Sequence, residues 1–212
     1  MTEVLGRLAA AGAPDDRFYG VTIGLVTNTK DPDGLGRVRV TMPWLGEGIE
    51  SGWARVAAPM AGAGRGCYLP PEVDDEVLVA FEHGDPEFPY VLGGLWNGTD
   101  KPPAENSDGR NDVRVLRSRS GHVIRLVDTK DAELVEIVDG SGRNSIVIST
   151  KDDTVTITAG ADVEITAAGT LRLHGRTVEI TSDADLTVHG GGELAVESDA
   201  VLTVKGRLVQ IN

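Results

Sequence analysis

The stretch TVTITAGADVEITAAGTLRLHG, residues 154–175, carries apolar residues in pairs at a nearly fixed interval. A new pair begins every eight residues, shortened to seven at two places, and its second member always follows two positions later. Each unit is a three-residue strand with two side chains on one face, and small residues turn the chain between units. The repeat predicts a β-helix whose core is formed by sixteen residues: Val155, Ile157, Val163, Ile165, Leu171, Leu173, Val178, Ile180, Leu186, Val188, Leu194, Val196, Leu202, Val204, Val209 and Ile211.

One chain with so few units leaves strand edges and both ends of the β-helix without hydrogen-bond partners. Three intertwined chains supply those partners, because each face then carries strands from all three copies in turn. A narrow three-fold axis also accounts for the absence of aromatic residues and proline from residues 104–212, since rings do not fit and proline lacks a ladder donor. We therefore predict an obligate homotrimer.

The N-terminal half has a different composition, with all nine aromatic residues and all ten prolines before residue 104. Short β-rich runs alternate there with turn signals, which predicts a small closed OB-fold barrel. The predicted strands are Val21–Val26, Arg37–Met42, Trp53–Ala58, Glu76–Phe81 and Tyr90–Leu95.

The predicted fold class is all-β, an N-terminal OB-fold barrel followed by a trimeric triple-stranded β-helix with octad repeats. We expect an N-terminal extension over residues 1–17, the OB-fold domain over 18–100, a linker and β neck over 101–150, and the spike over 151–212. The linker is KPPAENSDGRND, residues 101–112, which is rich in turn-forming residues.

A net charge of -13 opposes non-specific attraction to nucleic acid phosphates. Cys67 is the one cysteine, so an intrachain disulfide is excluded, and a small buried hydrophobic residue is expected there. The N-terminal sequence lacks a signal peptide pattern, and the chain has no apolar run of membrane-spanning length. We expect assembly in the cytoplasm.

Three segments of the first half resemble one known family: DPDGLGRVRVTMPW (31–44), SGWARVAAPMAG (51–62) and LPPEVDDEVLVAFEHGDPEFPYVLGGLWNGTDKPP (69–103). They resemble the OB-fold domain of contractile-tail central spike proteins. That family includes the valine–glycine repeat proteins (VgrG) of type VI secretion, phage baseplate assembly protein V and the spikes of extracellular contractile injection systems. Residues 117–150 resemble the family's neck, and the octads resemble its triple-stranded β-helix.

The resemblance implies a non-enzymatic, trimeric needle at the centre of a baseplate, without cofactors. Its OB-fold would dock on a separate hub protein, with residues 1–17 as a further hub contact. Sheath contraction would drive the β-helix transiently through the target membrane, and the chain would end up in a virion or injection particle. The interval between barrel and β-helix is too short for the lysozyme domain that some phage spikes carry.

The chain ends in GRLVQIN, without the iron-binding His-x-His tip of some phage spikes. Its last strand would expose the end of an apolar core. We expect a separate tip protein of the PAAR-repeat type to contact Val209, Gln210, Ile211 and Asn212.

Candidate chemistry elsewhere favours structural roles, and no catalytic, cofactor-binding or metal-binding residue is predicted. Ser120, His122 and Asp128 have the residue types of a hydrolytic triad, but nothing in the spacing orients a base or builds an oxyanion hole. The DPDG loop at Asp31 lacks the acidic ligand expected at position twelve of a calcium loop. We expect solvated turns at this loop and at the acidic cluster of Glu72, Asp74, Asp75 and Glu76. We expect surface positions for the histidines His83, His174 and His189, and a flexible loop at AGAGRG, residues 61–66.

Two alternatives belong to other functional classes. A trimeric β-helical tail spike or depolymerase acting on cell-surface polysaccharide requires a paired-carboxylate cleft, for which the octads offer only narrow faces. An OB-fold that binds single-stranded nucleic acid requires a basic groove lined with aromatic residues. No such groove is evident, and we expect Trp44, Trp53 and Trp96 to fill the barrel or its contact with the neck.

Overall fold

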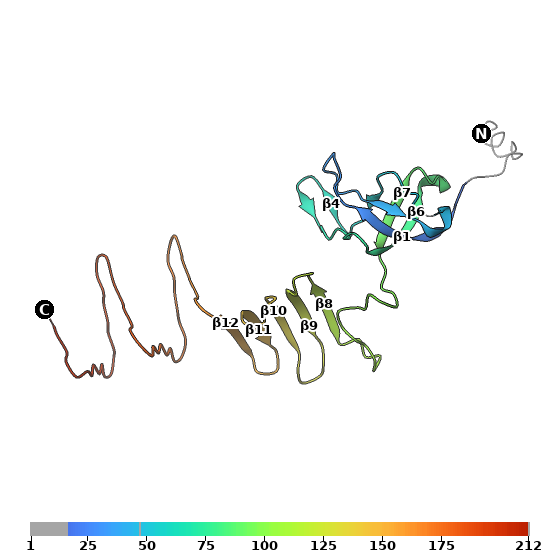
Figure 1. Cartoon of the computed structure of the whole chain (residues 1–212). Coiled ribbons are helices and arrows are strands. Elements are labelled where there is room, and N and C mark those ends of the chain that lie inside the picture. Colours follow the sequence, from blue (N-terminus) through green and yellow to red (C-terminus); the bar gives the residue numbers. More distant parts are fainter. Residues whose placement is uncertain (1–16, 47, 212) are drawn as a thin grey trace, which may run out of the picture. The chain divides into compact units, whose positions relative to one another are not determined.

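The computed structural model describes residues 17–46 and 48–211 (Figure 1). Contacts between Cα atoms divide the chain into two units, Met1–Gly160 and Ala161–Asn212. The first unit contains two five-stranded sheets and a small hairpin. The described residues contain almost no helix, so the all-β prediction is confirmed.

The first sheet is a curled OB-type sheet with the strand order β2-β1-β6-β7-β3. Its neighbours are antiparallel except for β3 and β7, which are parallel. Isolated bridges from Val38 to Ala54 and from Thr41 to Glu50 link the end of the sheet at β2 to the segment that leads into β3. The strands are β1 (Val21–Asn28), β2 (Arg39–Thr41), β3 (Arg55–Val56), β6 (Glu76–Phe81) and β7 (Pro89–Gly94), with 3-10 turns at Pro43–Leu45 and Glu82–Gly84.

All five strands predicted for this domain are present. AGAGRG, which we expected to be a flexible loop, instead forms a hairpin of β4 (Ala61–Gly62) and β5 (Arg65–Gly66). Gly66 permits this hairpin, because its φ is 152° and a Cβ atom there would lie 2.6 Å from the Met60 carbonyl oxygen. That expectation was therefore wrong.

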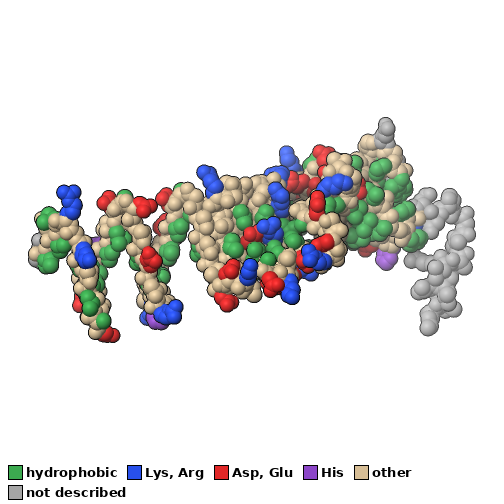
Figure 2. All heavy atoms as spheres, turned by 90° about the horizontal axis from the view of Figure 1, so that it is seen from below, with side chains coloured by type: hydrophobic (Ala, Val, Ile, Leu, Met, Phe, Trp, Pro, Cys, Tyr) green, Lys and Arg blue, Asp and Glu red, His purple; other side chains and the backbone are tan. Residues whose placement is uncertain are grey.

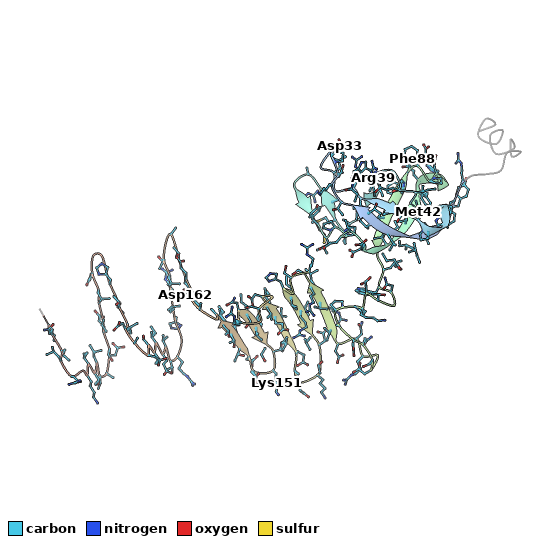
Figure 3. The ribbon with its side chains drawn as sticks, viewed as in Figure 1. Asp33, Arg39, Met42, Phe88, Lys151 and Asp162 are labelled. Atoms are coloured by element: carbon cyan, nitrogen blue, oxygen red, sulfur yellow. The ribbon has the colours of Figure 1, made fainter. Side chains whose placement is uncertain are left out.

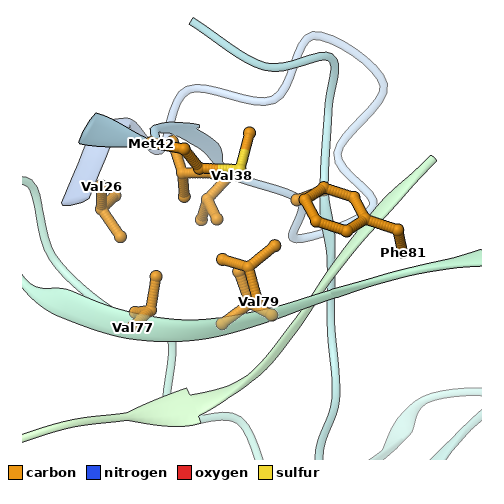
Figure 4. Close-up of a cluster of buried hydrophobic side chains, with 9 residues drawn as sticks. Val26, Val38, Met42, Val77, Val79 and Phe81 are labelled. Atoms are coloured by element: carbon orange, nitrogen blue, oxygen red, sulfur yellow. The ribbon is translucent and has the colours of Figure 1, made fainter. Parts of the chain in front are cut away.

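Alternation along these strands directs every second side chain into one small core (Figure 4). Gly24 on β1 lets the strands approach closely, since a Cβ atom there would lie 3.1 Å from a methyl group of Val79. The core consists of Val26, Val38, Val40, Met42, Ala54, Val77, Val79, Phe81 and Val91.

The second sheet, which we call the neck sheet, is an antiparallel meander in which each strand pairs with the next. The alternation expected in the neck thus appears as consecutive hairpins. The strands are β8 (Val113–Arg117), β9 (Val123–Val127), β10 (Leu134–Val138), β11 (Ser145–Ser149) and β12 (Thr154–Thr158).

The turn between β10 and β11 is held by the carboxylate of Asp139. It accepts hydrogen bonds from the hydroxyl of Ser141 and from the backbone N–H of Asn144. These donors, Ser141 first, lower the pKa of Asp139 from 3.8 to about 2. The side chain of Asn144 in turn accepts a hydrogen bond from the backbone N–H of Gly160, so this turn anchors the chain where it leaves β12.

The second unit follows β12 as an extended, repeatedly turning segment that includes Asp162 (Figures 1 and 3). Within residues 161–211, no strand is assigned and no backbone–backbone hydrogen bond occurs. Short side-chain contacts within its turns remain, such as the bond from the Ser182 hydroxyl to the Asp185 carbonyl. The triple-stranded β-helix and the domain boundaries stay predictions.

Candidate assembly surface

The register of the neck sheet places nine apolar side chains on one face, which we call the neck face. One row across the five strands is entirely aliphatic: Leu116, Ile124, Ile137, Ile146 and Ile157. The second row contains Leu126, Val135, Ile148 and Val155, with Arg114 at its end. Each of the nine is at least 40% exposed, which is unusual for a continuous apolar surface in a single soluble chain.

A shallow groove of about 430 Å³ runs along part of the neck face. Leu116, Ile124, Ile137 and Ile146 line it, and His122 and the Asp139 turn lie at its border. Almost all of its wall is aliphatic, so apolar side chains fit it best.

The opposite face of the neck sheet is more polar and less exposed. Its central row contains Val115, Arg125, Glu136, Val147 and Thr156. Glu136 is 9% exposed and forms an ion pair with Arg125, its direct cross-strand neighbour. The two faces therefore differ: the opposite face mixes half-buried aliphatic residues with polar groups and a charge pair, whereas the neck face is almost entirely aliphatic and exposed.

The neck face continues into the predicted spike core. Val155 and Ile157, the first apolar pair, lie on it beside Ile148 and Ile146. The sequence contains a signal for this face, because alternate residues in each of the paired strands before Val155 are apolar. Our sequence prediction extended the core only forward from Val155 and missed the neck residues.

The other fourteen predicted core residues are all exposed in the single chain, between 48% for Val209 and 92% for Ile211. Figure 2 shows hydrophobic side chains open to view along this segment. At the predicted tip contact, Val209, Gln210 and Ile211 are exposed, and Asn212 lies outside the described residues. The neck face and, separately, the apolar pairs of the second unit are thus left uncovered by the described part of the chain.

The residues with triad-like chemistry make other contacts. The Nδ1 atom of His122 accepts a hydrogen bond from the backbone N–H of Gly140 at 3.0 Å. The carboxylate of Asp128 pairs with Arg114. These contacts hold the ends of the neck strands.

The DPDG loop is organised around Asp31, whose side chain is 3% exposed rather than solvated as we expected. Its carboxylate accepts two hydrogen bonds from the Arg37 guanidinium and further bonds from the backbone N–H groups of Asp33, Leu35 and Arg37. The Arg37 side chain, followed by these backbone donors, holds the pKa of Asp31 far below its usual value. Its oxygens are occupied within the loop.

The tryptophans divide between packing and exposure. Trp44 stacks on Phe18 with ring centroids 5.0 Å apart and meets Phe81 edge-on, so it helps to close the barrel. Trp53 lies under the Arg39 guanidinium, 4.8 Å from ring centroid to charge centre. Trp96 is 70% exposed, so it does not fill the barrel, and the alternative that it lies in the contact between barrel and neck stays a prediction.

Other expected features have mixed outcomes. Cys67 is half-buried rather than buried. Over residues 17–46 and 48–211, no cluster of three or more histidine, cysteine or acidic side chains could hold a metal ion. No helix in this part of the chain has the length and apolar character needed to cross a membrane. Residues 1–16 of the expected hub contact lie outside the described residues.

Residues 22–96 match the type VI secretion system/phage-baseplate injector OB domain. This segment includes the curled sheet, apart from the first residue of β1, and all nine residues of its core. Residues 22–96 therefore form an OB domain of the type found in phage-baseplate injectors, and the chain is similar to VgrG spike proteins. The resemblance seen in the sequence is confirmed.

Curated relatives from two bacteria agree with this assignment. The chain is 34% identical over 135 residues to the type VI secretion system spike protein VgrG4b of Pseudomonas aeruginosa, covering 58% of this chain and 17% of the relative. It is 35% identical over 92 residues to the spike protein VgrG3 of Vibrio cholerae, covering 42% and 9%. Vibrio cholerae actin cross-linking toxin VgrG1 is 36% identical over 75 residues, covering 34% and 7%. The chain thus spans less than a fifth of the length of these relatives.

Proposed function

We propose that three copies of this chain form the non-enzymatic central spike of a contractile phage-tail-like baseplate. The OB domain docks on a hub protein, the β-helix pierces the target envelope, and a separate tip protein caps the far end. The injector OB domain and the similarity to VgrG spike proteins support the baseplate role. The observation that carries the trimer is the uncovered apolar surface of the neck face and the octads.

Burial of that surface provides the driving force for assembly. Fully burying one aliphatic side chain contributes roughly 1.5–3 kcal/mol, and each chain has more than twenty at stake. A single chain that left them exposed would aggregate or associate. Closed three-fold association buries all of them around one axis and leaves no free apolar face.

The backbone leads to the same arrangement. β12 is the edge strand of the neck sheet, paired with β11 alone. Beyond it, the octads of residues 161–211 have no ladder partners in the described part of the chain. Neighbouring copies supply strands beside β12 and beside the octads, and these strands satisfy the free backbone N–H and C=O groups of both.

Docking on a hub is supported by apolar side chains on the outside of the OB domain. Val21, Ile23 and Leu25 alternate along β1 on the face turned away from the core, and they are 53%, 48% and 41% exposed. A flat, partly apolar strand face suits a permanent protein partner. We propose residues 1–17 as the second part of this contact.

At the other end, Ile211 is 92% exposed and ends the apolar core. We propose that a PAAR-type protein covers Val209, Gln210, Ile211 and Asn212. A covering protein removes the cost of leaving core residues in water. It also provides the sharp point that a blunt three-stranded end lacks.

The mass of the purified protein in native conditions tests the proposal. We expect three times the chain mass of 22.4 kDa, independent of dilution in the micromolar range. A clean, soluble monomer would overturn the spike function. Capture assays with the hub and tip proteins encoded nearby then test each end, using Ile23→Lys for the hub and Ile211→Asp for the tip. Loss of the corresponding partner alone is expected, and unchanged capture of both would refute the two contacts.

A further inference from the structure

The apolar octads by themselves do not define how the three chains align. In a three-fold interwound β-helix, each chain moves to the next face with each octad. The strand above octad k on any face is therefore octad k+1 of a neighbouring chain, about 4.8 Å away. All eight apolar pairs are Val, Ile or Leu, so one chain shifted by an octad would still fill the core. This inference rests on the proposed trimer.

The residue between the two core positions of each octad points outward, and its charge differs from octad to octad. These residues therefore distinguish the correct alignment from a shifted one. Across consecutive octads they form one column on each face, and three neighbours in it are Glu164, Arg172 and Glu179. Each comes from a different chain, so every Arg172 lies between two carboxylates of its neighbours. Opposite charges at adjacent strand positions stabilise a sheet, and like charges destabilise it.

A second column has the same character nearer the tip. The residue that follows each core pair is His189, Glu197 and Lys205 in three consecutive octads. Glu197 of one chain then lies between basic residues of the other two. The two columns use different outward positions and different octads, so they constrain alignment independently.

The single chain leaves these six side chains available. All six are exposed, and within residues 161–211 none forms an ion pair. Glu164 makes one local contact, accepting a hydrogen bond from the hydroxyl of Thr166. The occupant that fits them is a second copy of the same chain, because its next octad presents the complementary charge at the matching position.

We propose that these two inter-chain charge ladders set the register of the three chains in the spike. A shift by one octad places Glu164 beside Glu179, and His189 beside Lys205. The first ladder then changes from attraction to repulsion, and the second loses the carboxylate of Glu197 between His189 and Lys205 at that point. The apolar core supplies the affinity, and the ladders select one alignment among several that bury the same surface.

Mixing two charge-altered chains tests the proposal. Arg172→Glu makes the first column entirely acidic, and the double variant Glu164→Arg/Glu179→Arg makes it entirely basic. Each homotrimer then carries like charges on all faces, whereas in mixed trimers most column contacts become attractive. We co-express the two chains with tags of different mass and count trimer compositions by native mass spectrometry.

Mixed trimers are expected well above the share that random mixing gives, and this excess should shrink in 1 M salt as charges are screened. Arg172→Glu alone should lower the melting temperature of its homotrimer by about 5 °C at low salt. The matched control Arg176→Glu makes the same charge change in a turn and should mix randomly.

Random mixing of the first pair, with intact trimers throughout, would overturn the ladders and leave the spike function standing. A monomeric unaltered chain would instead overturn the trimer itself. The two failures are therefore distinguishable in the same experiment.

Discussion

Ile137 is the residue whose truncation best separates an assembled neck face from an exposed one. It lies at the centre of the aliphatic row, between Ile124 and Ile146, and is 48% exposed in the single chain. An exposed isoleucine changed to alanine alters stability by about 0.5 kcal/mol or less. The same change in a packed interface costs about 2–5 kcal/mol.

About half of the Ile137 side chain is already covered by its own chain, so we take the lower end of that range. Ile137→Ala should then cost about 2 kcal/mol per chain. Three copies make about 6 kcal/mol per trimer, which weakens the association constant by about four orders of magnitude.

Unfolding in guanidinium chloride at two protein concentrations measures this cost, because the midpoint of an obligate trimer depends on concentration. Val201→Ala is the matched control, since Val201 is 77% exposed and lies outside the apolar pairs. Its midpoint should stay within error of the unaltered protein. Equal midpoints for Ile137→Ala and Val201→Ala would refute the burial of the neck face.

Three further changes test other contacts. Asp139→Asn should remove the acid sensitivity that Asp139 itself causes: this carboxylate, with its folded pKa lowered from 3.8 to about 2, contributes above pH 3.8 and loses that contribution as the pH falls through 2. The melting temperature of the unaltered protein should therefore fall more steeply from pH 5 to 2 than that of the variant. Arg125→Met should cost about 1–3 kcal/mol by leaving the buried Glu136 unpaired; adding Glu136→Leu should recover most of this loss in a denaturation cycle. Glu193→Lys should raise the melting temperature by about 2–4 °C. Asp185 and Glu193 precede consecutive core pairs, so in the proposed trimer they are like-charged neighbours from two chains, and the change replaces repulsion with attraction. An unchanged or lower melting temperature would contradict the placement of consecutive octads of different chains next to each other.

The OB domain was predictable from sequence because its signals are local. Period-two alternation fixed the strands, and the turn residues around Asp31 marked the first hairpin. The short β4–β5 hairpin was missed, since a pair of two-residue strands has no periodicity to detect. The burial of Asp31 was also missed, because it depends on Arg37 folding back across the loop, which spacing alone does not specify.

The assembly surface was only half predictable, for a different reason. The octads repeat in sequence, so counting finds them. The neck face has no repeat, and its residues come together only through hairpin registers such as Ile137 opposite Ile124 and Ile146. Those registers depend on turn lengths that vary from hairpin to hairpin. An alternating pattern reveals that one face is apolar, but pairing is needed to show that successive strands present it on the same side.

The predicted spike begins where the described chain no longer pairs with itself in a ladder. Up to β12, each hairpin returns the chain beside its previous strand, so one chain makes its own antiparallel ladder. At Gly160 the chain leaves the sheet, bonded to Asn144, and a Cβ atom there would lie 2.9 Å from Arg143. Glycine is therefore needed at the exit point.

After that point the turns contain only four or five residues between apolar pairs. All strands of such a coil run in the same rotational sense, so hydrogen-bonding neighbours must be parallel. In the proposed trimer each octad rises by one strand spacing, so a chain comes back to its own face only after three units, about 14 Å along the axis. Two strands from other copies fit into that interval at normal sheet spacing. In the proposed trimer, strands of two partner chains fill the interval that the chain's own strands leave open, and the octad spacing is in this way consistent with three chains.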